Sequence, residues 1–208
     1  MTFFDQAILL LTGLTAVYLI WRLWGRYSEE KALHDVYYAI AMLVLFIAGV
    51  LLIFGGWGLL DSPYILTVAT LIPLGLSLGL MNQFMPEYKK AYSWFALFGF
   101  LTVAFTSITG SSLKSIAVPV FHGVAGLIIV GLPLYLCLVK KTAPKGFGLI
   151  SLGGILISLG GMALAFLNAG KQLLFFSAEV VMAILAPLLF LMALAFTFGF
   201  VRDIDKDK

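Results

Sequence analysis

Two ionisable side chains lie within long apolar stretches of this chain, where a charge is costly. Glu179 is the one acidic residue of ten inside such a stretch, and His122 lies near the start of another. A carboxylate in hydrocarbon costs at least about 2.5–3.5 kcal/mol, so we expect Glu179 to face protein or water, or to be protonated. A carboxylate beside an imidazole could take up a proton, bind a polar head group or orient a ligand.

If the apolar stretches cross a membrane in alternating directions, three further polar residues lie near the outer surface, at a depth similar to that of Glu179 and His122. They are Thr106, Thr109 and Asn168. We therefore predict an outer-leaflet polar pocket in which His122 and Glu179 lie within hydrogen-bond reach and bind a ligand or a proton. The alternative is that each group bonds separately to a nearby backbone carbonyl.

Membrane-spanning helices are the elements that would position these residues. The 208-residue chain is 62% hydrophobic and 11% charged, whereas a soluble domain carries about 25% charged residues. Continuous apolar runs of about 20 residues indicate helices that cross the hydrocarbon core rather than the alternating strands of a membrane barrel. We predict a single all-α transmembrane domain, residues 1–208, built as a seven-helix bundle. The expected spans are about 6–24, 36–57, 63–82, 92–110, 117–139, 147–168 and 173–201.

The basic residues predict an orientation. Eleven of the thirteen Lys and Arg residues fall in segments that seven crossings place on one side. Cytoplasmic loops are enriched in Lys and Arg, so we expect the N-terminus outside and the C-terminus in the cytoplasm, in the cytoplasmic (plasma) membrane of a prokaryote. The eleven residues are Arg22, Arg26, Lys31, Lys89, Lys90, Lys140, Lys141, Lys145, Arg202, Lys206 and Lys208.

Three prolines, Pro73, Pro133 and Pro187, lie inside predicted spans. Each removes a helix hydrogen bond, which predicts ordinary kinks or, in the sharper interpretation, hinges.

Small residues form a stripe along the predicted sixth span. Such a face allows close approach of another helix, within the monomer or at a dimer contact. The stripe consists of Ser151, Gly154, Ser158 and Gly161.

Several kinds of chemistry are disfavoured. The two histidines, His34 and His122, are predicted at opposite membrane faces, which argues against a shared haem or metal site. The single cysteine, Cys137, cannot form an internal disulfide. The last span lacks the mid-helix lysine of retinal proteins, and no HExxH, GxSxG or phosphate-loop motif occurs.

Three functional hypotheses remain open. We favour a non-enzymatic, receptor-like or accessory subunit that binds a small or lipidic ligand in the outer pocket and acts through a membrane partner. The alternative is a small secondary transporter with Glu179 as its proton or ligand site. An intramembrane lipid-modifying enzyme is less favoured. We predict no dedicated cofactor, although a bound lipid or quinone is compatible with the pocket. The expected partners are membrane lipids and another membrane protein or a second copy, without nucleic acid.

Overall fold

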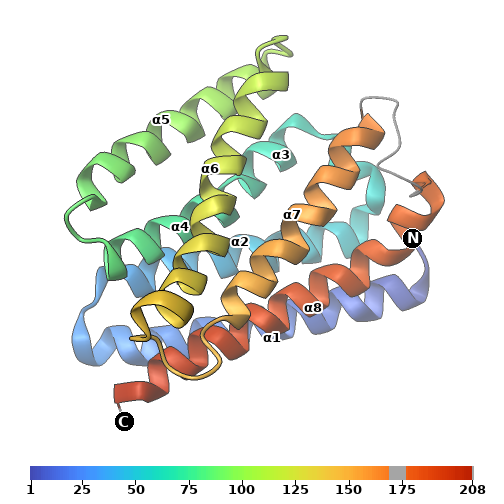
Figure 1. Ribbon diagram of the computed structural model, residues 1–208. Helices are drawn as coiled ribbons and strands as arrows, with labels where there is room; N and C mark the ends of the chain where they lie inside the picture. Colours follow the sequence, from blue (N-terminus) through green and yellow to red (C-terminus); the bar gives the residue numbers. More distant parts are fainter. Residues whose placement is uncertain (169–176, 208) are drawn as a thin grey trace.

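The computed structural model describes the backbone of residues 1–168 and 177–207 and the side chains of residues 1–164 and 177–206. Within that part of the chain every regular element is helical, which confirms the all-helical fold class (Figure 1). The α-helices are α1 (Phe3–Glu30), α2 (Leu33–Gly55), α3 (Pro63–Ala69), α4 (Leu71–Phe84), α5 (Lys89–Ile108), α6 (Lys114–Tyr135), α7 (Leu149–Asn168) and α8 (Ala178–Ile204). Three short helical turns are η1 (Trp57–Asp61), η2 (Leu136–Lys140) and η3 (Asp205–Asp207).

Six helical segments of the described chain are long and apolar enough to cross a bilayer. They are Phe3–Glu30, Leu33–Gly55, Pro63–Phe84, Lys89–Ile108, Lys114–Lys140 and Ala178–Ile204. The predicted sixth span corresponds to α7, in which Leu149–Leu164 forms a shorter apolar helix. Large apolar side chains such as Phe54 and Leu127 are exposed, as expected of a surface that faces lipid. The seventh crossing and the membrane orientation remain predictions.

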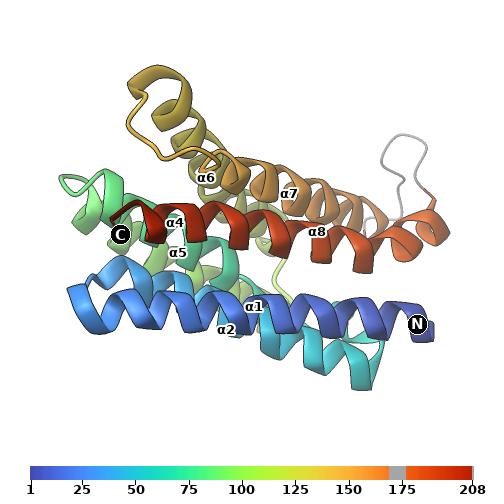
Figure 2. The ribbon, with the colours of Figure 1, turned by 90° about the horizontal axis from the view of Figure 1, so that it is seen from below.

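The first and last long helices lie side by side and run in the same direction (Figure 2). Helix α1 packs against α2 and α8, and α2 packs against α4. Helix α7 lies between α6 and α8, while α5 packs against α3, α4 and α6. Large side chains fill the centre of the bundle, among them the fully buried Leu23, Tyr38, Met42, Phe196 and Phe200.

Capping hydrogen bonds at both ends of α1 define where this helix begins and where the chain turns into α2. The hydroxyl of Thr2 accepts from the backbone N–H of Asp5, and the Asp5 carboxylate accepts from the N–H of Thr2, so α1 starts in a capping box. At the other end, Lys31 adopts a left-handed conformation (φ 55°) and its N–H donates to the Tyr27 carbonyl at 2.9 Å. The chain then turns directly into α2.

The three interior prolines differ in their local structure. Pro73 lies just after the interruption between α3 and α4 at Thr70, where its missing N–H leaves the Ala69 carbonyl without its usual helix partner. Pro133 is followed within three residues by the π-helical turn η2. Pro187 lies within the continuous helix α8. Because the helix is interrupted at Thr70, the predicted third span consists of two consecutive helices, α3 and α4.

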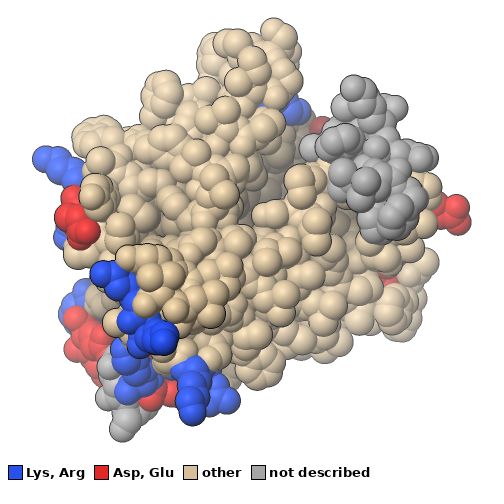
Figure 3. Space-filling model, in the orientation of Figure 1, with Lys and Arg blue, Asp and Glu red and all other residues tan. Residues whose placement is uncertain are grey.

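The last helix is shifted along the sequence relative to the predicted span. Ser177 caps its start by accepting a hydrogen bond from the Val180 N–H at 3.3 Å, and the helix continues to Ile204. Residues 173–176 of the predicted span lie outside the described part. The end of α8 reaches the end of the bundle at which most basic side chains gather (Figure 3), which we call the basic end.

Candidate functional site

Three of the five residues of the predicted outer pocket bond to backbone carbonyls four positions earlier in the chain. His122 Nδ1 lies 3.1 Å from the Val118 carbonyl of its own helix. Thr106 and Thr109 donate to the carbonyls of Thr102 and Phe105, one turn earlier in α5. Their arrangement matches the alternative in which each polar group satisfies a nearby backbone carbonyl.

Glu179 lies exposed in the first turn of α8. Among the described side chains it forms no hydrogen bond or ion pair with His122, which lies on α6. Helix α7 packs between those two helices, which accounts for the separation. The side chain of Asn168 lies outside the described residues.

Of the four small residues of the predicted stripe, Ser151 and Gly154 contact α6 closely. Ser151 donates to the Val130 carbonyl of α6 at 2.7 Å, and a Cβ added to Gly154 would lie 2.8 Å from Ile129. Ser158 donates to the Gly154 carbonyl of its own helix, and Gly161 is exposed with no heavy atom within 4 Å of an added Cβ. This face therefore serves close packing of α7 on α6.

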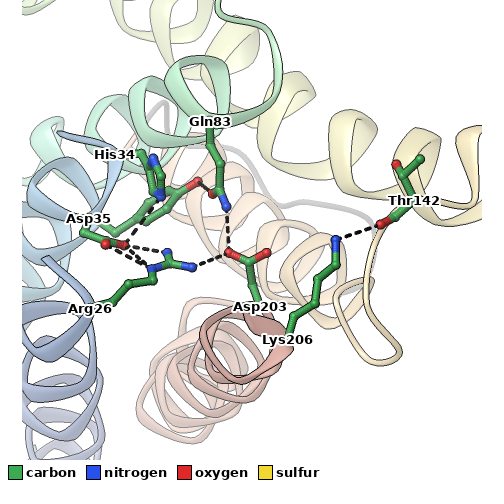
Figure 4. Close-up of polar contacts among 8 residues, drawn as sticks. Arg26, His34, Asp35, Gln83, Thr142, Asp203 and Lys206 are labelled. Carbon is green, nitrogen blue, oxygen red and sulfur yellow. Dashed lines mark hydrogen bonds and ion pairs between the residues drawn. The ribbon is translucent and has the colours of Figure 1, made fainter. Parts of the chain in front are cut away.

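A different group of ionisable residues is brought together inside the protein. At the basic end, four helices contribute to one buried hydrogen-bonded cluster (Figure 4). We call it the Arg26 network. Its members are Arg26 from α1, His34, Asp35 and Tyr38 from α2, Gln83 from α4 and Asp203 from α8.

The guanidinium of Arg26 is the centre of this network. Its Nε lies 3.0 Å from both carboxylate oxygens of Asp35, and its Nη2 also donates to Asp35. Its Nη1 donates to Oδ2 of Asp203 at 2.8 Å. Arg26, Asp35 and Asp203 are 5%, 1% and 5% exposed, so all three are shielded from solvent. Charge-assisted bonds of this kind are about twice as strong as bonds between neutral groups.

Neutral side chains complete the network on the side of α4. Gln83 donates from Nε2 to Oδ2 of Asp203 at 2.7 Å, and its Oε1 accepts from the hydroxyl of Tyr38 at 2.9 Å. Tyr38 is completely buried and its ring packs on Phe200 with centroids 4.3 Å apart. A continuous chain of hydrogen bonds thus links Asp35 to Tyr38 through Arg26, Asp203 and Gln83.

The charges of the network do not cancel when all its acids are ionised. Arg26 supplies one positive charge, whereas Asp35 and Asp203 supply two negative charges. His34 lies at the edge, with its Nε2 3.8 Å from Oδ1 of Asp35, and would neutralise the excess if protonated. With both carboxylates ionised and His34 neutral, the network therefore carries one excess negative charge.

The sequence patterns missed this site because its members look like ordinary loop and tail residues. The predicted spans 6–24 and 173–201 end just before Arg26 and Asp203, yet α1 and α8 extend through both. No sequence spacing links residues 26, 35 and 203, so their convergence follows only from the packing of α1, α2 and α8.

Comparison with known proteins gave no relative: no family model, no curated protein and no solved structure matches the chain. In the described residues there is also no group of three or more His, Cys, Asp or Glu side chains placed to hold a metal ion. The fold and its apolar surface indicate a helical membrane protein. Its most distinctive polar feature is the Arg26 network.

Proposed function

We propose that the protein is a small proton-coupled membrane transporter in which the Arg26 network binds the coupling proton. The observation that carries this proposal is the pairing of one buried guanidinium with two buried carboxylates across α1, α2 and α8. Ionisable groups buried between the helices of a membrane protein are candidate parts of ion pathways and proton relays, here at the basic end of the bundle. Relative to the secondary transporter expected from the sequence, the proton site moves from Glu179 to Asp203 and its partners.

Charge balance gives the network a reason to take up a proton. An uncompensated charge in a low-dielectric site costs several kcal/mol. The ionisable and polar groups around Asp203 are Arg26 from α1, Asp35 and His34 from α2, and Gln83 from α4. A proton on one of the acids or on His34 removes the excess negative charge.

Proton uptake would also weaken a contact between helices. A neutral Asp203 accepts more weakly from Arg26 and Gln83 than an ionised Asp203 does. The contact of α8 with α1 and α4 would loosen at the basic end, and the interruption at Thr70 would let α4 adjust its direction. If that end faces the cytoplasm, as the concentration of basic residues favours, the network would act as the inner gate.

Transport currents test this proposal. The purified protein is reconstituted in liposomes on a solid-supported membrane and exposed to panels of amino acids, sugars, organic acids and organic cations. We expect one panel to evoke a pH-dependent current, and Asp203→Asn to abolish it. Asp61→Asn, which removes an exposed acid from η1, is the matched control and should retain the current. A folded wild-type protein without any evoked current, or an unchanged current in Asp203→Asn, would contradict the proposal.

A second candidate function is a non-enzymatic subunit that binds a ligand and acts through a membrane partner. An exposed row on α5 favours it, because the four side chains recur at spacings of three and four and could receive a partner helix. The row consists of Trp94, Phe98, Leu101 and Phe105. Native mass spectrometry after mild extraction should then show a fixed partner, lost when Phe98 and Phe105 are changed to Leu. Retention of the partner in that variant would argue against this surface.

A further inference from the structure

The charged side chains at the end of α8 and in η3 point in two directions. Asp203 bonds to Arg26 of α1, and Asp205 forms an ion pair with Arg22 of the same helix. Arg202, near the end of α8, and Lys206, in η3, are both exposed, and both lie against the connection between α6 and α7. Asp203 and Asp205 are thus engaged with α1, while Arg202 and Lys206 are not.

The connection between α6 and α7 lies beside these two cations. Lys206 Nζ donates to the Thr142 carbonyl at 3.3 Å (Figure 4). Gly146 has φ +93°, a conformation that favours glycine, and a Cβ added there would lie 3.2 Å from Cγ of Arg202. The connection is therefore held against the end of α8 by two separate contacts.

This connection adds three exposed cations, Lys140, Lys141 and Lys145, and residues 136–148 contain no acid. Together with Arg202 and Lys206 they form what we call the α8–loop basic surface. None of the five has an ion pair with a described carboxylate. A concentration of one sign of charge remains open to an anion from outside the protein.

The α8–loop basic surface lies next to an exposed apolar surface, which indicates the kind of anion that it binds. Leu138 and Val139 are 69% and 66% exposed and immediately precede Lys140, so an apolar surface ends where the cations begin. Lys140 Nζ lies 6.0 Å from the ring centroid of Tyr135, an aromatic residue of the kind that favours the membrane interface. If α6 spans a bilayer, these cations lie where its lipid head groups begin.

We propose that the α8–loop basic surface binds the phosphate of anionic phospholipids in the adjacent leaflet. Lys140, Lys141 and Lys145 supply the attraction, and Arg202 supplies a planar donor group that can bind a phosphate through two hydrogen bonds. Bound lipid would bridge the end of α8 and the α6–α7 connection. This site is independent of proton binding in the Arg26 network.

Lipid titration of the purified protein, followed by native mass spectrometry, tests the proposal. Phosphatidylglycerol should bind, and phosphatidylcholine of the same chain length should not compete. The triple variant Lys140→Gln, Lys141→Gln and Lys145→Gln should lose at least about tenfold in affinity for phosphatidylglycerol. The matched control is Lys31→Gln, Lys89→Gln and Lys90→Gln, which removes the same charge from exposed positions after α1 and at the start of α5 and should change the affinity less than about twofold.

A second variant separates lipid binding from folding. Arg202→Lys keeps the charge but removes the planar fork, so it should weaken phosphatidylglycerol binding while the far-UV circular dichroism is unchanged. Equal losses in the two triple variants, or equal binding of phosphatidylcholine, would overturn the proposal. Displacement of the lipid by millimolar inorganic phosphate would also overturn it, because the site would then recognise a soluble anion.

Discussion

Nη1 of Arg26 lies 2.8 Å from Oδ2 of Asp203, although 177 positions separate the two residues in the chain. This bond joins the first long helix to the last one inside the protein, and both side chains are about 5% exposed. A buried charge of this kind is tolerated only while its partners remain.

Removal of the central cation should destabilise the fold. Arg26→Gln leaves the carboxylates of Asp35 and Asp203 buried without their cation, which costs about 3–5 kcal/mol. We expect a clearly lower Tm for the detergent-solubilised variant, followed by circular dichroism. Arg22→Gln is the matched control: its ion pair with Asp205 is partly exposed and contributes about 0–1 kcal/mol. Equal Tm values for the two variants would contradict the central role of Arg26.

The hydroxyl of Tyr38 should contribute measurably. Tyr38→Phe removes the donor to Gln83 Oε1 within a buried network, so we expect a loss of about 1–2 kcal/mol in the free energy of unfolding. Tyr37→Phe, at the neighbouring position, removes a hydroxyl that has no hydrogen bond to a described residue and should be nearly neutral. Denaturant titration of both variants measures the difference, and a neutral Tyr38→Phe would show that the hydrogen bond is unimportant.

Close approach of α4 to α2 depends on glycine at position 79. A Cβ added there would lie 2.2 Å from the Tyr38 ring, so Gly79→Ala must push the helices apart or move the ring. We expect a loss of about 1–3 kcal/mol, the usual cost of overpacking. Gly161→Ala, on the exposed face of α7, should be neutral or slightly stabilising because alanine favours helix. Equal thermal stability of both variants would refute this tight contact.

Glu179 and Asp203 should differ in their effects on transport. Glu179→Gln changes an exposed residue in the first turn of α8, so the transport current and the Tm should both remain near wild type. Asp203→Asn should abolish the current for the reason given above. A current that depends on Glu179 and not on Asp203 would restore the outer pocket as the functional site.

Hydrophobicity alone was enough to predict a helical membrane protein, because apolar runs of about 20 residues have few other stable solutions. It could not place the helix ends. Residues such as Arg26 and Asp203 are polar enough to look like loop residues, yet the described helices continue through both. The positions are fixed by capping and by ion pairs between helices, and a hydropathy pattern contains neither.

The predicted pocket illustrates the second limit of the sequence. Similar depth in the membrane suggested that His122 and Glu179 meet, but depth leaves the direction around the bundle undetermined. In the structure α7 packs between α6 and α8, and His122 bonds within its own helix. Which helices are neighbours depends on side-chain volume, as the close contact of Gly153 on α7 with Phe196 on α8 shows.

The order in which the partners of Arg26 are synthesised has a consequence for biogenesis. Asp35 follows only 9 positions after Arg26, so these two can associate as soon as the first hairpin enters the bilayer. Asp203 is synthesised 177 positions after Arg26, so it reaches Arg26 only after the intervening helices have been made. A nascent chain halted before position 203 would keep a half-completed ion cluster, which membrane quality-control proteases could recognise as unfinished.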